Sequence, residues 1–287
     1  NPANQGLDYQ DVILINEIGQ RLHGWWLPAR GGAAHAKGTV YFLHGNAQNV
    51  STHIMNVAWM PAEGFNVFLL DYRGYGLSEG KARLPEAMED IQLGLDWLRA
   101  SGRLNKQPLI VFGQSLGASM TISVMAEERN HGRYECLIAE AAFTGYRDIV
   151  GDIMRQSWLL SPLRFAVVPF QPRKFDAQDS IAAIRAPILL MHSQDDQVIP
   201  FAHGTELFEA ASEPKQFQPL RGAHIASLRD PAVRQRMLDF MYQECGVRSV
   251  SATPDAKGDA SESGASPVLP RGPASNGVSR PAPGFTF

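Results

Sequence analysis

Residues 109–120 read LIVFGQSLGASM, and this stretch decides the fold of the chain. A short run of branched and aromatic residues, typical of a buried parallel strand, leads directly into Gly-x-Ser-x-Gly, and helix formers follow. A strand, a tight turn and a helix in this order hold the central serine in a strained backbone conformation. Gly113 and Gly117 are needed because a side chain at either position would collide with the crossing strand and helix. We therefore predict that Ser115 is a nucleophile at a helix N-terminus, where backbone N–H groups stabilise a developing oxyanion.

Strand and helix patterns alternate on both sides of this stretch. The chain opens with two strand patterns around Gly19, at 9–16 and 21–27, which predict an antiparallel hairpin. Further strands are expected at 39–43, 66–72, 136–141, 187–191 and 216–220, and helices at 50–61, 85–101, 118–128, 201–211 and 231–244. This alternation predicts an α/β fold with a mainly parallel sheet that helices cover on both faces.

Two segments depart from the alternation. Residues 143–174 form a long connection between two strands and carry many large apolar side chains. We expect a small apolar cap over the site, with a helix pair on the sheet edge or a membrane-facing segment as alternatives. Residues 247–287 are rich in Ser, Ala, Pro, Gly and Asp, so a disordered tail is expected after a single domain at 1–246.

The composition bounds the classes of function. The formal net charge is −3, without a basic stripe or an acidic block, so no nucleic-acid partner is expected. No run approaches the roughly 18 consecutive apolar residues of a membrane span. The sequence begins at Asn1 rather than methionine, so we expect a trimmed or processed chain. Any signal peptide or lipid anchor would have preceded Asn1. A cell-envelope or membrane-associated location stays open, and the composition does not indicate an oligomeric state.

Cysteine and histidine spacing gives no sign of a metal site. Cys136 and Cys245 are far apart in the sequence, and Cys136 lies in an apolar strand, where we expect a buried, inert thiol. His44 and His192 stand at strand ends and are expected to pack and form hydrogen bonds locally. No histidine shows ligand spacing with carboxylates or thiols, and no glycine-rich loop matches a phosphate or dinucleotide fingerprint. Neither a metal nor a cofactor is expected.

A serine nucleophile needs a base to accept its proton and an acid to orient that base. Two adjacent carboxylates, Asp195 and Asp196, follow the strand expected at 187–191. This is where sites form in open α/β sheets. His224 stands in a loop after the last expected strand, ahead of the closing helix. The order serine, acid, histidine along the chain differs from the orders of the two well-known protease families and is that of α/β-hydrolases.

The sequence resembles the α/β-hydrolase superfamily of serine hydrolases from about Tyr9 to Gly246. Within it, the chain looks most like the branch with a His-Gly-Asn-Ala loop, which includes esterases and protein-depalmitoylating thioesterases. Five pieces carry the resemblance in the expected order, namely HGNA at 44–47, DYRGYG at 71–76, the Gly-x-Ser-x-Gly pattern, DQVIP at 196–200 and GAH at 222–224. The resemblance implies the α/β-hydrolase fold.

The resemblance also selects the acid. In this family the acid stands four residues before a proline in the pattern Asp-x-x-Val/Ile-Pro, which points to Asp196 rather than Asp195. Asp195 is then expected to face solvent or to cap the turn. Ser193 is a departure, because the family usually has glycine at that position.

An oxyanion hole follows from the same resemblance. It implies one donor in the backbone N–H of Leu116, the residue after the nucleophile, and another in the His-Gly-x loop. We expect Asn46 to be the second donor, with Ala47 as the alternative. Ala47 and Tyr75 are also candidate substrate-binding residues, although Tyr75 equally fits as a plug of its own loop.

Together these patterns predict a serine hydrolase that cleaves ester or thioester bonds through an acyl-enzyme on Ser115, acting on a small-molecule or acylated substrate. A peptidase of aminopeptidase type shares the triad and stays open. So does an acyltransferase, in which an alcohol replaces water. A non-catalytic binding module with this fold is the alternative from another class, and it is disfavoured because all three triad members are present.

Overall fold

The computed structural model describes residues 1–156 and 175–248 of the 287-residue chain. Of the insertion expected to form a cap, the described part contains its beginning, helix α4 (Tyr146–Gln156). The rest of the cap predicted at 143–174, residues 157–174, and nearly all of the tail predicted at 247–287, residues 249–287, lie outside the described residues.

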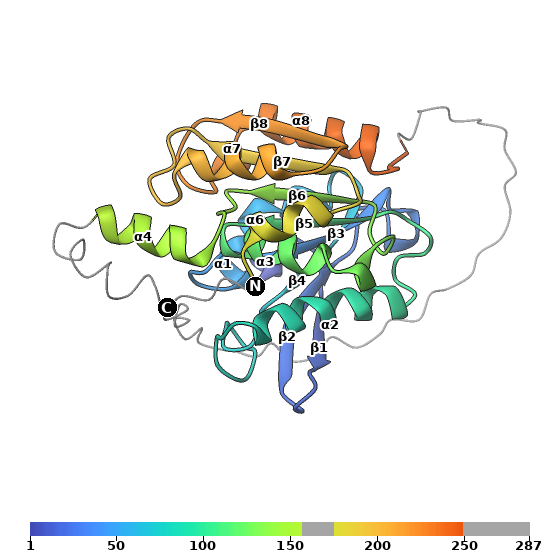
Figure 1. Cartoon of the computed structure of the whole chain (residues 1–287). Coiled ribbons are helices and arrows are strands. Elements are labelled where there is room, and N and C mark those ends of the chain that lie inside the picture. The colour runs from blue at the N-terminus through green and yellow to red at the C-terminus, as the bar shows by residue number, and fades with distance from the viewer. Residues whose placement is uncertain (157–174, 249–287) are drawn as a thin grey trace, which may run out of the picture.

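The described strands form one sheet in the order β1-β2-β4-β3-β5-β6-β7-β8. β1 (Gln10–Ile15) and β2 (Arg21–Leu27) form the predicted antiparallel hairpin, which projects from one end of the sheet in Figure 1. β2 pairs antiparallel with β4. The parallel part of the sheet consists of β3 (Gly38–Leu43), β4 (Phe65–Leu70), β5 (Leu109–Gln114), β6 (Cys136–Glu140), β7 (Ile188–Ser193) and β8 (Lys215–Leu220).

Helices cover both faces of the sheet (Figure 1). The α-helices are α1 (Val50–His53), α2 (Glu86–Ala100), α3 (Leu116–Met125), α4, α6 (Ala177–Ser180), α7 (Phe201–Ala210) and α8 (Pro231–Glu244). Short 3₁₀ turns are η1 (Pro2–Gln5), η2 (Ala33–His35), η3 (Ile54–Asn56), η4 (Glu128–Asn130), η7 (Ile181–Ala183) and η8 (Ser227–Arg229). One hydrophobic cluster contains side chains of α2, α3 and α7, and a second contains side chains of α1 and α8.

Strand β3 shows why the sequences of the central strands are continuous runs of apolar residues. Every residue of β3 is buried, and successive side chains point to opposite faces. Tyr41 and Leu43 belong to the cluster under α2 and α3, whereas Val40 and Phe42 belong to the cluster under α8. The prediction of a mainly parallel, doubly covered sheet is confirmed.

Most predicted elements occur with bounds that differ by a few residues. The exception is the helix expected at 50–61, which is α-helical only in α1 and continues as η3 and turns. Hydrogen bonds from residue i to residue i−3, such as that from the Val57 N–H to the Ile54 carbonyl at 2.9 Å, replace the α-helical i to i−4 pattern there. The segment carries several β-branched residues, which lower helix propensity, so apolar spacing alone overestimates the helix.

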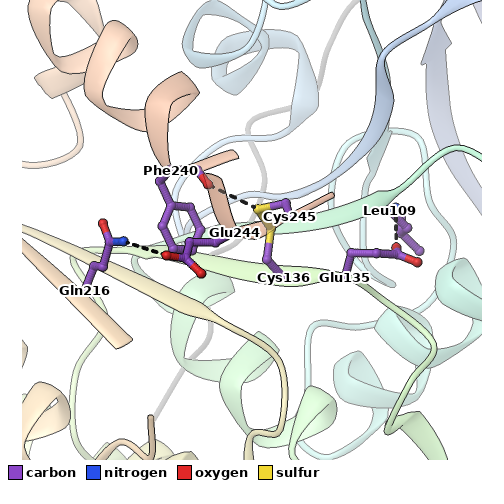
Figure 2. The surroundings of a disulfide bond; sticks show 7 residues. All are labelled: Leu109, Glu135, Cys136, Gln216, Phe240, Glu244 and Cys245. Carbon is purple, nitrogen blue, oxygen red and sulfur yellow. Dashed lines mark hydrogen bonds between the residues drawn. A yellow bond between two sulfur atoms is a disulfide. The ribbon is translucent and has the colours of Figure 1, made fainter. Parts of the chain in front are cut away.

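The expectation of an inert thiol at Cys136 is wrong. Cys136, the first residue of β6, forms a disulfide with Cys245, which directly follows α8. The two Cα atoms are 5.2 Å apart, both residues are fully buried, and Figure 2 shows the bond between the strand and the end of the helix. The pair is separated by 109 positions and comes together because α8 packs on the sheet, which spacing in the sequence does not reveal.

Across residues 1–156 and 175–248, no helix combines the length and the apolar character needed to cross a membrane.

Candidate active site

Ser115 lies between the end of β5 and the start of α3, as predicted. Its backbone angles are φ 56° and ψ −124°, a strained conformation that residues with side chains rarely adopt. A Cβ atom on Gly113 would lie 2.6 Å from the Cα of Ala118, and one on Gly117 would overlap the carbonyl oxygen of Leu43. Both glycines therefore have the role that the sequence assigned to them.

His224 connects the serine to a carboxylate. Its Nε2 lies 3.0 Å from Ser115 Oγ, and its Nδ1 lies 2.6 Å from Asp196 Oδ2. Asp196 comes from the loop after β7 and His224 from the loop after β8, so the three residues meet at the carboxyl ends of parallel strands. The Asp196 side chain is fully buried, whereas that of His224 is 17% exposed. The structure thus brings together the three residues that the sequence selected.

Asp196 is held as an ionised acceptor. Its Oδ1 accepts hydrogen bonds from the backbone N–H groups of Val198 at 2.8 Å and Ile199 at 2.9 Å. Burial acts to raise the pKa of Asp196, but the hydrogen bonds from His224, Ile199 and Val198 outweigh burial and hold the pKa below its usual value. An ionised Asp196 accepts the Nδ1 proton of His224, which leaves Nε2 as an acceptor that faces the Ser115 hydroxyl.

The neighbouring carboxylate has a different role. Asp195 accepts hydrogen bonds from Arg221 Nη1 at 2.8 Å and from the Gly222 N–H at 3.1 Å. These two contacts hold the pKa of Asp195 below its usual value. Ser193 Oγ also donates to the Gly222 carbonyl, at 2.6 Å. Asp195 and Ser193 therefore tie the loop that carries Asp196 to the loop that carries His224, a role that sequence reasoning missed. The serine at position 193, where the family usually has glycine, was the feature of the sequence that could have indicated this contact between the loops.

The loop after β3 runs directly beside the nucleophile. A Cβ atom on Gly45 would lie 3.2 Å from the Cβ of Ser115, so the next residue, Asn46, starts close to the serine. The hydroxyl of Tyr75 donates to Asn46 Oδ1 at 2.8 Å. Leu116, the other predicted donor, is the first residue of α3, where backbone N–H groups have no acceptor within the helix.

Tyr75 is fully buried and packs its ring against His44 and Tyr72. The sequence left two roles open for this side chain, packing inside its own loop or lining a pocket. The structure favours packing inside the loop. Its contact with Asn46 makes it a support for the loop that borders Ser115.

Buried histidines stabilise the same region through local contacts, as predicted for His44 and His192. His44 Nδ1 donates to the Gly45 carbonyl at 2.7 Å, and His192 Nε2 donates to the Ile199 carbonyl at 3.0 Å. His53 donates Nε2–H to the Ala47 carbonyl at 2.8 Å. Burial, with a smaller contribution from His44, lowers the pKa of His53 to about 4, so this ring is neutral at pH 7.

Comparison with known proteins places the chain in a family. A family model described as serine aminopeptidase, S33, matches residues 34–172. The uncharacterized protein YfhR of Escherichia coli is 32% identical over 238 residues, which are 81% of this chain and 80% of YfhR. The α/β hydrolase domain-containing protein WAV2 of Arabidopsis thaliana is 29% identical over 218 residues, 74% of this chain and 69% of WAV2. The chain belongs to the α/β-hydrolase superfamily.

Solved structures agree with this assignment at the level of the fold. Esterase Pf2001 of Pyrococcus furiosus matches this α/β hydrolase with a TM-score of 0.69 and 21% identity, over 85% of this chain and 96% of the esterase. The α/β hydrolase GrgF of Penicillium sp. sh18 matches with a TM-score of 0.65 and 19% identity, over 83% of this chain and 99% of GrgF. These matches confirm the predicted fold.

Helix α4 of this α/β hydrolase is fastened to α7 by a buried histidine. His203 Nε2 donates to Asp152 Oδ2 on α4 at 2.8 Å, and its Nδ1 accepts the Thr144 N–H at 3.2 Å. The spacing of His203 in the sequence gives no metal-ligand pattern and no other role, and its contacts follow from the packing of two helices. Within the described ranges, no group of three or more His, Cys, Asp or Glu residues could hold a metal ion.

Proposed function

We propose that this α/β hydrolase is a serine hydrolase of the esterase or thioesterase type, with Ser115, His224 and Asp196 as its triad. The observation that carries the proposal is the continuous hydrogen-bonded line from Ser115 Oγ through the His224 ring to Asp196, with contacts of 3.0 Å and 2.6 Å. The positive φ of Ser115 supports it, because strain of this kind concentrates at functional positions.

In the first half of the reaction, Ser115 Oγ attacks the carbonyl carbon of an ester or thioester. His224 Nε2 accepts the hydroxyl proton as the new C–O bond forms. Asp196 stabilises the imidazolium and keeps the ring in its tautomer. The tetrahedral intermediate then expels the alcohol or thiol, which takes the proton from His224 and leaves an acyl group on Ser115.

The charge that develops on the carbonyl oxygen requires donors. We assign these to the backbone N–H groups of Leu116 and Asn46, with Ala47 as the alternative to Asn46. The contact from Tyr75 to Asn46 orients this loop. A single donor of this kind is worth about 10²–10³ in rate.

In the second half, a water molecule replaces the leaving group. His224 accepts a proton from the water as its oxygen attacks the acyl carbon, and then returns the proton to Ser115 Oγ as the acid is released. The sequence resemblance to esterases and depalmitoylating thioesterases favours an acyl group of fatty character, bound to an oxygen or sulfur leaving group.

The test is hydrolysis of p-nitrophenyl esters from acetate to palmitate, and of the matching acyl thioesters, by the wild type and S115A. We expect S115A to lose activity by about 10⁶-fold, as removal of the nucleophile does in a comparable triad. The acyl chain length that gives the highest kcat/KM indicates the length of the pocket that binds the acyl group. Equal activity of the two proteins on every substrate would contradict the proposal.

A second candidate is a peptidase of aminopeptidase type, favoured by the description of the matching family model as serine aminopeptidase, S33. The same triad would attack an amide, with His224 protonating the leaving amine. Aminoacyl p-nitroanilides assayed beside the esters distinguish the two candidates. Faster turnover of the anilides with a free amino group than of any ester would select the peptidase.

A further inference from the structure

A buried carboxylate stands beside the triad, and the mechanism above does not use it. Glu140 is the last residue of β6, next to Gln114 of β5 in the sheet register. It is 2% exposed. A carboxylate in such a place destabilises the fold unless strong hydrogen bonds compensate for the loss of water, so its contacts indicate what it does.

Glu140 accepts hydrogen bonds from two side chains on different segments. Gln114 Nε2 donates to Glu140 Oε2 at 2.5 Å, and Ser227 Oγ donates to Glu140 Oε1. The Gln114 amide is itself fastened on its other side, because its Oε1 accepts from Asn56 Nδ2 at 2.7 Å. The backbone takes part as well, since the Ser115 N–H donates to the Glu140 carbonyl at 2.8 Å.

These contacts join the two halves of the active site. Gln114 directly precedes the nucleophile, and Ser227 follows His224 by three residues, at the start of η8. Ser115 and His224 are separated by 109 positions and lie on segments that share no strand pair. Glu140 is thus in contact with the neighbours of both residues.

The histidine loop needs such an anchor. It has two residues with positive φ, Gly222 at 101° and Ile225 at 49°, and its backbone bonds are short-range turns such as that from the Ala226 N–H to the Ala223 carbonyl. A loop of this kind has no regular ladder to fix its position. Asp195 and Ser193 hold its beginning, and Ser227 holds its end.

We propose that Glu140 is a positioning residue that keeps His224 within reach of Ser115 through Ser227. The inference rests on the triad proposed above and adds a residue to it. Displacement of a catalytic group by about 1 Å can cost about 10² in rate. Loss of this anchor should therefore lower kcat more than it changes KM, because it affects proton transfer rather than substrate binding.

The experiment uses S227A, E140Q and E140A, with E135A as the matched control. Glu135 lies just before the other end of β6, and its Oε2 accepts the Leu109 N–H at 2.5 Å (Figure 2). It is thus a carboxylate that also bonds to β5, but away from the triad. We expect kcat on p-nitrophenyl esters to fall roughly 10–100-fold in S227A and E140A, with KM within about threefold and kcat unchanged in E135A. S227T, which keeps the hydroxyl, should restore most of the activity.

A double-mutant cycle separates positioning from general destabilisation. If Glu140 acts through Ser227, the double variant E140A/S227A should be no slower than E140A, whereas independent effects would multiply. Melting temperatures recorded beside kcat show whether each variant is folded. E140Q and S227A keep the test available if E140A does not fold.

A measurement without turnover distinguishes failure of this inference from failure of the proposed function. The proton between His224 Nδ1 and Asp196 gives a downfield proton NMR signal that is identified by its loss in H224Q. We expect this signal to shift or broaden in S227A and E140Q and to stay in place in E135A. Wild-type kcat together with an unmoved signal in S227A and E140Q would overturn the role of Glu140. A wild type inactive on every substrate, with the signal displaced in these variants, would overturn only the function.

Discussion

At the scale of the residue, Asp195 and Asp196 show how adjacent identical side chains acquire different roles. The Asp196 side chain is fully buried and bonds to the His224 ring, whereas that of Asp195 is exposed and bonds to Arg221 and Gly222. Gln194 and Asp195 form a turn after β7, which leaves the Asp195 side chain at the surface while that of Asp196 is buried. Only Asp196 is in contact with His224.

D196N and D195N test this division. D196N keeps the size of the side chain but removes the charge that stabilises the imidazolium, and we expect kcat/KM to fall by roughly 10³–10⁴. D195N should stay within about threefold of wild type, because an exposed ion pair contributes little and the amide oxygen can still accept from Gly222. Ester hydrolysis at pH 7.5 measures both. Similar losses in the two variants would contradict the assignment of Asp196.

His53 predicts a pH dependence of stability. The pKa of His53 is about 4 in the folded protein and 6.5 when the ring is exposed to water, as in the unfolded chain. Between pH 4 and pH 6.5 the unfolded chain therefore binds a proton that the folded protein does not. The free energy of unfolding should therefore rise with pH from 4 to 6.5, by about 3 kcal/mol at most from this group, and level off above.

Urea unfolding at intervals between pH 4 and pH 7 measures this effect. The variant H53Q keeps a donor for the Ala47 carbonyl but cannot take up the proton, so its stability should rise less steeply over the same window. An unchanged slope in H53Q would show that other groups cause the pH dependence, and His192, whose pKa burial also lowers, is the first of these.

At the scale of the element, the close approach of α3 to β3 determines how Ser115 is presented. Gly117, the second residue of α3, lies directly against the carbonyl groups of Leu43 and His44, at the end of β3. No side chain fits in this space, so the helix can pack across the strand only with glycine there. The turn that strains Ser115 depends on the same crossing.

G117A should consequently destabilise the protein strongly, by about 3 kcal/mol or more, because its Cβ would meet rigid backbone atoms. The control is G132A, at a glycine that unlike Gly117 has a positive φ, but where nothing lies within 4 Å of the added Cβ. G132A should lower the free energy of unfolding by about 1–2 kcal/mol, from backbone strain alone. Urea unfolding monitored by tryptophan fluorescence compares the two, and equal losses would disprove the steric argument.

At the scale of the whole molecule, the Cys136–Cys245 disulfide closes a loop that contains Asp196 and His224 but not Ser115. It fastens the end of α8 to the start of β6 (Figure 2). The other end of β6 carries Glu140. Since the bond links positions 109 residues apart, it restricts the unfolded chain substantially. Disulfides of this kind persist in oxidising compartments.

Reduction of this bond should lower the free energy of unfolding by about 2–4 kcal/mol. Thermal unfolding with and without dithiothreitol measures the loss, and the C136A/C245A variant should melt near the reduced wild type and show no response to the reductant. Thiol titration of the denatured, unreduced protein should find no free thiol. Two free thiols together with a melting temperature that dithiothreitol does not change would contradict the disulfide.

Local patterns of the sequence determined the order of strands and helices, the turn around Ser115 and the identity of Asp196 and His224. Hydrophobic periodicity and glycine spacing report on interactions between near neighbours, and these decide where an element begins and ends. Motif order then supplied the triad without any knowledge of distance. The helix expected at 50–61 marks the limit, because apolar spacing does not reveal where i to i−3 bonding takes over.

Contacts between distant segments were decided only by the tertiary structure. The pairs Glu140–Ser227 and Cys136–Cys245 are 87 and 109 positions apart, and no periodicity connects residues at such separations. Burial likewise made Tyr75 a support of the Asn46 loop, one of two roles that its sequence position allowed equally. The sequence by itself thus selected the three residues that meet in the structure. Packing decided what holds them in place, because positioning depends on neighbours in space rather than along the chain.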